Sequence, residues 1–173
     1  MKKPILFLLV GYPGAGKTMI SRMIAELTDA AHIWADQERV SRYGKPTFSN
    51  AENKEFYDEL NAHTDKLLSQ GVDVIFDTSF NYRSDRDHLR SIADKNNAEV
   101  KLLWIRTKKE LAYERATKNA HEQDTRPLSD MHHDDFHRLS DSLEEPTKDE
   151  NAIELVGEDV TAGYLKTKLN LHD

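Results

Sequence analysis

Apolar residues of this 173-residue chain collect in short runs that polar segments separate. The clearest run is ILFLLV at residues 5–10. An uninterrupted apolar run of this length is typical of a strand that is buried on both faces of a parallel sheet. The predicted strands are residues 5–10, 31–35, 72–76, 99–105 and 152–156.

Between these runs, apolar residues recur three or four positions apart, which is the spacing of one buried helix face. After the first run this spacing holds for Met19, Ile20, Met23, Ile24 and Leu27. The other predicted helices are residues 51–70, 83–96, 108–118, 129–143 and 160–169. This alternation predicts an α/β fold, a five-stranded parallel sheet flanked by helices on both faces. No repeat or linker divides the chain, so we predict a single domain over residues 1–173.

The segment GYPGAGKT at residues 11–18 lies between the first predicted strand and the first predicted helix. It matches G-x-x-x-x-G-K-[ST], the P-loop of nucleotide-binding proteins, in the strand–loop–helix context that the motif requires. Glycines let the loop bring backbone N–H groups up to phosphate oxygens, and the helix adds the positive end of its dipole. We therefore predict phosphate binding by Gly11, Pro13, Gly14, Ala15, Gly16, Lys17 and Thr18.

Two of these residues have separate tasks. Lys17 can reach the β- and γ-phosphates, and the Thr18 hydroxyl can join the coordination shell of Mg²⁺. Because the ligands of doubly wound sheets bind at the carboxyl ends of the strands, polar residues at those ends should converge on the P-loop.

The charge and composition limit the kinds of partner and site that this protein is expected to have. The chain has 24 Lys and Arg against 31 Asp and Glu, a net charge of −7 at pH 7. This net negative charge argues against tight binding of a polynucleotide, but it allows transient binding of a nucleic acid in a local basic groove. The absence of cysteine excludes disulfides and cysteine-ligated zinc. The apolar run after Met1 is too short for a signal peptide or a membrane span, so we expect a cytoplasmic protein with no membrane partner.

Asp36 and Arg39 come directly after the second predicted strand, at the edge of the sheet that the P-loop shares. If a helix begins there, both side chains point toward the phosphates. Asp36 would then accept the proton of an acceptor hydroxyl, and Arg39 would hold the acceptor by a charged hydrogen bond. The alternative is a helix-capping aspartate beside a solvated arginine. Next to a P-loop we favour the catalytic interpretation.

Asp77 ends the third predicted strand in the form of a Walker B carboxylate, which binds Mg²⁺. Because Thr78, Ser79 and Asn81 follow it, Asp77 could instead orient the acceptor. The sequence leaves these two roles open.

Residues 106–138 are rich in charge and are predicted to form a helical lid. A lid arginine can neutralise the negative charge of the transferred phosphoryl group as the site closes. Arg115 and Arg126 are the best placed by sequence, ahead of Arg106 and Arg138, although an exposed arginine is often only solvated.

Histidines gather near the end of this segment. Neighbouring residues on a helix point in different directions, and their spacing matches no established zinc site. We therefore predict no zinc site at His132, His133, Asp134, Asp135 and His137.

The chain resembles the small P-loop kinases grouped as AAA_33-type ATP-binding proteins. Their relatives include the kinase domain of polynucleotide kinases, zeta-type toxins and chloramphenicol phosphotransferase. The matching segments are LFLLVGYPGAGKT, the D-x-x-R of residues 36–39, VIFDTSF with the arginines that follow it, AYER at residues 112–115, and the segment from PLSD to PTKDE at residues 127–150.

The resemblance implies site roles. Lys17 and Thr18 would bind ATP and Mg²⁺, with Asp36 as the general base. Arg39 would contact the acceptor, and Arg115 with Arg126 would act from the lid.

These observations predict an ATP-dependent kinase that moves the γ-phosphoryl group to a hydroxyl acceptor. The acceptor could be a nucleic-acid 5′-hydroxyl, a small metabolite or antibiotic, or a nucleotide sugar as in zeta-type toxins, which would normally need an antitoxin partner. The alternative is a nucleotide-binding or ATPase module that regulates a partner protein without phosphorylating a substrate.

Overall fold

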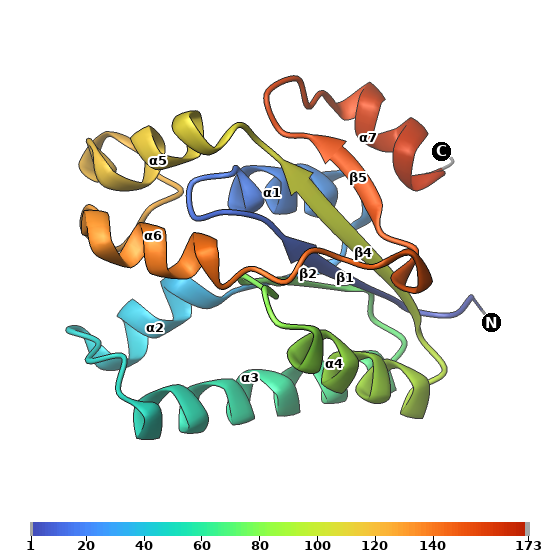
Figure 1. Ribbon diagram of the computed structural model, residues 1–173. Helices are drawn as coiled ribbons and strands as arrows, with labels where there is room; N and C mark the ends of the chain where they lie inside the picture. Colours follow the sequence, from blue (N-terminus) through green and yellow to red (C-terminus); the bar gives the residue numbers. More distant parts are fainter. Residues whose placement is uncertain (1, 172–173) are drawn as a thin grey trace.

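The predicted strands form one parallel sheet in the computed structural model, which describes residues 2–171 (Figure 1). Its strand order is β2-β3-β1-β4-β5. The pairing places Leu8 of the central strand opposite Phe76 on one side and Leu102 on the other. The strands are β1 (Ile5–Val10), β2 (Ala31–Trp34), β3 (Val74–Asp77), β4 (Glu99–Arg106) and β5 (Ile153–Val156). The predicted α/β fold with a five-stranded parallel sheet is confirmed.

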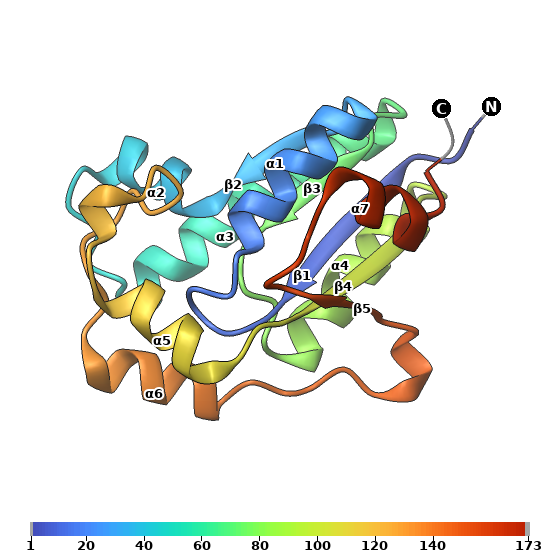
Figure 2. The ribbon, with the colours of Figure 1, turned by 90° about the horizontal axis from the view of Figure 1, so that it is seen from above.

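Helices cover both faces of this sheet. The α-helices are α1 (Lys17–Thr28), α2 (Ala35–Tyr43), α3 (Asn50–Ser69), α4 (Arg83–Lys95), α5 (Lys109–Thr117), α6 (His133–Asp141) and α7 (Ala162–Leu169). Two short 3₁₀ turns, η1 (Ala120–Glu122) and η2 (Lys148–Glu150), lie between them. Helices α1 and α7 lie on one face, and α3 and α4 lie on the other (Figures 1 and 2).

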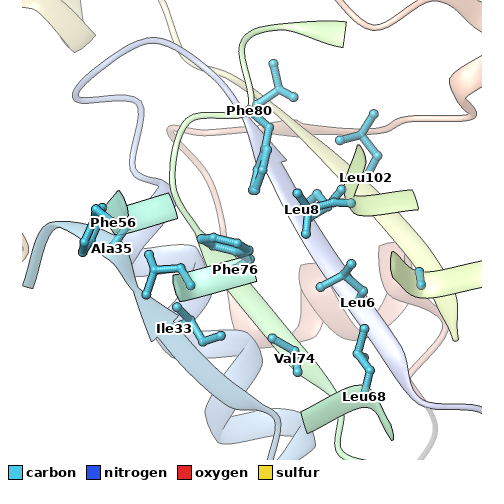
Figure 3. Packing of buried hydrophobic residues seen from close by; sticks show 14 residues of the cluster. Leu6, Leu8, Ile33, Ala35, Phe56, Leu68, Val74, Phe76, Phe80 and Leu102 are labelled. Atoms are coloured by element: carbon cyan, nitrogen blue, oxygen red, sulfur yellow. The ribbon is translucent and has the colours of Figure 1, made fainter. Parts of the chain in front are cut away.

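The two cores follow from the alternation of side chains along β1. Leu6 and Leu8 point toward α3 and α4, into a core cluster that includes Phe56 of α3 and Phe76 of β3 (Figure 3). Phe7 and its neighbours on the opposite face pack against α1 and α7. Because both faces are covered, β1 is apolar at every position, which explains the uninterrupted run in the sequence.

Several elements differ from the prediction in their bounds. Strand β3 starts at Val74 instead of residue 72, because the Val72 N–H still bonds to the Leu67 carbonyl at the end of α3 (3.1 Å). Helix α2 has no counterpart among the predicted helices, although the interpretation of Asp36 allowed for it.

Helix α6 is shorter than the predicted 129–143, since it runs over His133–Asp141. The residues before it are held by α5 and its surroundings. The Asp130 carboxylate accepts the Ala120 N–H (2.5 Å), and the Met131 N–H donates to the Ala116 carbonyl (2.9 Å).

The two ends of the sheet have different surroundings. Helices α2, α5 and α6 lie beyond the carboxyl ends of the strands, whereas β1 begins and α7 ends at the opposite end (Figures 1 and 2). None of the helices within residues 2–171 is both long and apolar enough to cross a lipid bilayer.

Candidate active site

The P-loop links β1 to α1 and packs directly on α5. Gly14 has a φ of +79° and Gly16 a φ of +103°, a left-handed conformation that other residues rarely adopt. A Cβ atom on Gly14 would lie 2.2 Å from the Ala112 carbonyl oxygen of α5. Glycine at position 14 is therefore required both by the turn and by the neighbouring helix.

Lys17 begins α1 at the floor of the site. Its Nζ donates to the carbonyls of Gly11 (3.0 Å) and Tyr12 (2.7 Å). Burial lowers the pKa of the Lys17 ammonium to about 8, although Asp77 and Asp36 act in the opposite direction. The ammonium is thus held at the loop, near enough to Asp77 and Asp36 for their charges to act on it.

Asp36 lies in the first turn of α2 and faces a cleft. Its side chain is exposed to the solvent of the cleft, yet protein surrounds it on most sides. This partial loss of water raises the pKa of the Asp36 carboxyl, and the Asp77 carboxylate raises it further, while Arg126 and Lys17 oppose the shift. A carboxylate in such surroundings is a stronger base than a fully solvated one.

Asp77 has a partner that the sequence did not reveal. The Asp77 Oδ2 lies 2.9 Å from the His32 Nε2, and both side chains are largely shielded from solvent. The His32 ring stacks near Trp34, with ring centroids 6.2 Å apart. Only the pairing of β2 with β3 brings these residues together, because 45 positions separate them. The sequence feature that could have pointed to this pair is an ionisable residue, His32, inside a short predicted strand.

Arg39 is held within the wall of the cleft. It is 3% exposed, and its Nη1 donates to Glu52 Oε1 of α3 (2.8 Å). Glu52 also accepts the Thr47 hydroxyl (2.6 Å) and the Thr47 N–H (2.8 Å). Hydrogen bonds from Thr47, assisted by the one from Arg39, lower the pKa of Glu52 to about 2. No pattern along the chain predicts the pairing of Glu52 with Arg39.

The two predicted lid arginines both line the cleft but have different neighbours. Arg126 is close enough to Asp36 for the two charges to interact, and its Nη2 donates to the Ala116 carbonyl (3.2 Å). Burial lowers the pKa of the Arg126 guanidinium, and its Nε is buried without a hydrogen-bond partner. Arg115 lies beside the start of α1, with its Nη1 3.9 Å from where a Cβ of Gly16 would be.

The weaker candidates are further from the phosphates. Arg106 pairs with Glu154 (3.2 Å) and stacks on Trp104, outside the cleft. Arg138 lines the cleft and pairs with Asp135 (3.0 Å). The loop that carries Arg126 is tied to α1, because Arg22 Nη1 lies 3.0 Å from the Asp124 carboxylate.

A cleft of about 1840 Å³ opens at the carboxyl ends of the strands. The P-loop and Asp77 form its floor. One wall is the α2–α3 region, and the other consists of residues 122–132 and part of α6. Lys17, Thr18, Asp36, Asp77, Arg115 and Arg126 all line it. The cleft is large enough for a nucleotide and a second substrate.

The donor set of the cleft suits Mg²⁺. Thr18 offers a hydroxyl oxygen, and Asp77 offers its Oδ1 while His32 engages Oδ2. Oxygen ligands completed by water are what Mg²⁺ prefers. Within the described residues, no group of three or more His, Cys, Asp or Glu side chains is arranged to hold a metal ion. His133 and His137 instead pack on Tyr113 of α5.

Sequence comparison agrees with this architecture. The profile of AAA_33, described as an AAA domain, matches residues 6–146. The chain belongs to the AAA_33 family. No curated protein matches the chain by sequence.

Members of several kinase groups share the fold of this AAA_33 chain. A sugar kinase from Janibacter sp. is similar, with 22% identity, 99% of this chain and 96% of that chain covered, and a TM-score of 0.65. A gluconokinase from Sinorhizobium meliloti has 19% identity, 96% and 89% coverage, and a TM-score of 0.64. The Mycobacterium tuberculosis APS kinase, solved with AMPPNP and APS, has 14% identity, 99% and 98% coverage, and a TM-score of 0.69. The fold is thus that of the P-loop kinases.

Proposed function

We propose that this protein is an ATP-dependent kinase that transfers the γ-phosphoryl group to a hydroxyl of a small molecule or a nucleic-acid 5′ end. The observation that carries the proposal is the convergence of Lys17, Asp36, Asp77 and Arg126 on the P-loop within one cleft. This set supplies a phosphate cradle, a base and a counter-charge. The family and the kinases that share the fold agree with it.

The chain's own groups divide the work of holding the nucleotide. The N–H groups of the P-loop and the Lys17 ammonium hold the phosphate oxygens of ATP. Thr18 and Asp77 would hold Mg²⁺, which when bound neutralises charge on the β- and γ-phosphates. His32 keeps the Asp77 carboxylate oriented through its 2.9 Å contact.

The chemical step needs a base beside the acceptor. Asp36 takes the proton of the acceptor hydroxyl, and the resulting oxygen bonds to the γ-phosphorus as the bond to the β–γ bridging oxygen breaks. The products are a phosphate monoester and ADP. Lys17 and Arg126 stabilise the charge that spreads over the transferred group. We propose that residues 106–138 act as the lid of a single kinase domain and bring Arg115 and Arg126 to that charge.

The Asp36→Asn variant tests this proposal. Phosphoryl transfer from γ-labelled ATP should fall by on the order of 10²–10⁴-fold, because a positioned base is lost, while ATP affinity stays within about threefold. Glu38→Gln, an exposed residue on the same helix, is the matched control and should leave transfer unchanged. Acceptors are 5′-hydroxyl oligonucleotides, nucleosides, sugars, nucleotide sugars and aminoalcohols. Transfer that survives in Asp36→Asn would overturn the assignment of the base. ATP binding with transfer to no acceptor would instead favour a nucleotide-dependent regulatory module.

A further inference from the structure

Exposed apolar side chains in the described part of the chain concentrate in the cleft. Met19, Phe48 and Tyr82 are 43%, 49% and 45% exposed, and all three line it. The remaining large exposed apolar residue there, Val156, lies outside the cleft. Apolar groups that are left open inside a cleft mark a place where a bound ligand would cover them.

Phe48 has an unusual backbone conformation. It lies in the loop between α2 and α3 with a φ of +55°, which bulky residues avoid. The loop is pinned there, since the Phe48 N–H donates to Glu52 (3.3 Å) and the Phe48 carbonyl accepts from Asn53 (3.2 Å). Strained residues that their surroundings hold in place cluster at ligand sites.

The support beneath the Phe48 ring is the Arg39 guanidinium. Its central carbon lies 4.7 Å from the Phe48 ring centroid and 4.3 Å from that of Phe56, so the guanidinium is enclosed between the two rings. The charge of Arg39 is paired with Glu52, and both side chains are at least nine-tenths buried. Arg39 therefore stiffens the ring of Phe48, and its charge is already paired with Glu52. Contact of Arg39 with the acceptor, which the resemblance implies, stays a prediction.

Besides Arg39, two lysines of this wall line the cleft, Lys45 and Lys54. Lys54 pairs with Asp58 (2.5 Å). Lys45 is exposed and has no carboxylate partner among the described residues. A nucleic-acid strand would need several free cations along its backbone, and one lysine does not supply them.

We propose that Phe48 is the stacking platform of the acceptor subsite, and that the acceptor is a small uncharged ring compound with a free hydroxyl. A nucleoside and a monosaccharide share this chemistry. The proposal rests on the kinase function proposed above and names its acceptor class. The platform belongs to the same wall as Asp36, three residues before Arg39 on α2, so a ring stacked on Phe48 is held in the cleft that contains the base.

The Phe48→Asn variant separates a binding role from a structural one. Asparagine tolerates the left-handed conformation, so the melting temperature should stay the same or rise. Loss of stacking should raise the acceptor KM by roughly 5- to 150-fold, with the KM for ATP unchanged. Phe48→Trp should keep the acceptor KM within about threefold of wild type. Val156→Asn, an exposed apolar residue outside the cleft, is the control and should change neither KM.

Matched acceptors test the charge requirement. Uridine is compared with uridine 3′-monophosphate, and glucose with glucuronate, which keeps the sugar ring and adds a carboxylate, by the kcat/KM of transfer from γ-labelled ATP. In at least one pair, the kcat/KM for the neutral member should be higher than that for the charged member by tenfold or more. That pair then shows whether the acceptor is a nucleoside or a monosaccharide. Preference for the charged members, transfer only to a 5′-hydroxyl oligonucleotide, or an unchanged acceptor KM in Phe48→Asn would overturn the subsite while leaving the kinase function intact. Transfer to no compound of the wider panel would overturn the kinase function itself.

Discussion

Glu150 is a carboxylate sealed inside the protein among positive groups, and its removal should be costly. Both of its oxygens accept hydrogen bonds from Arg86 (2.7 and 2.8 Å), and Arg90 adds another (2.7 Å). Arg86 also donates to the carbonyls of Phe80 (2.9 Å) and Glu144 (3.1 Å). The network thus joins α4 to the loop that lines the cleft after β3 and to the chain segment after α6.

The Glu150→Gln variant would leave the Arg86 guanidinium buried without its counter-charge. The side chains of Arg86 and Glu150 are 1% and 0% exposed, so solvent cannot replace the lost partner. Breaking one side of such a buried pair typically costs about 3 to 5 kcal/mol. With a urea m-value of about 2 kcal/mol per molar, the unfolding midpoint should fall by about 1.5 to 2.5 M.

The neighbouring residue provides the control. Asp149 pairs with Arg83 at 2.7 Å, but its side chain is 65% exposed, so Asp149→Asn should shift the midpoint by only a small fraction of the Glu150 effect. Replacing both buried partners, with Arg86→Met and Glu150→Met together, should recover part of the loss, because no charge is then left unpaired. Equal midpoints for Glu150→Gln and Asp149→Asn in urea titrations followed by circular dichroism would refute the reasoning.

Two further predictions concern the P-loop and acid pH. Gly14→Ala should lower the free energy of unfolding by about 1 to 2 kcal/mol for its left-handed backbone, and by more because the new Cβ would lie 2.2 Å from the Ala112 carbonyl. Gly71→Ala, with a φ of +77° and no atom within 4 Å, should lose only the first amount. Equal losses of stability for the two variants in thermal melts, or an unchanged ATP Kd for Gly14→Ala, would contradict the contact. Burial alone would raise the pKa of Glu150, but hydrogen bonds from its arginine partners outweigh burial and lower it to about 2, as hydrogen bonding does for Glu52. Because both folded-state pKa values lie below the ordinary 4.5, this stabilisation is complete above about pH 4.5 and is lost as the pH falls toward 2; a urea midpoint that stays constant between pH 5 and pH 2.5 would exclude it.

The elements that local pattern controls were predictable from the sequence. β1 is buried on both faces, so its composition alone identifies a strand, and the P-loop requires a strand before it and a helix after it. The carboxyl-end rule then placed Asp36 and Asp77 at the edge of the sheet that carries the P-loop. The elements whose bounds were predicted wrongly depend on contacts with residues that are distant in the sequence. Residues 129–132 have a sequence compatible with helix, but hydrogen bonds to α5 and η1 hold two of them outside it.

The fine structure of the site was beyond the sequence for the same reason. Arg39 has the spacing of a residue that contacts an acceptor, yet its partner Glu52 comes from a different helix, 13 positions away. His32 meets Asp77 only through the register of two neighbouring strands. A pattern along the chain predicts in which direction a side chain leaves its own helix or strand. It does not predict which charged side chain of another element lies opposite.

The placement of the first strand and the last helix has a practical consequence. β1 starts and α7 finishes at the end of the sheet opposite the cleft (Figure 1). A surface anchor or fluorescent label attached at either place would leave the entrance to the cleft unobstructed. The protein can therefore be immobilised in one orientation. Compounds that bind weakly in the cleft can then be screened without interference from the attached group.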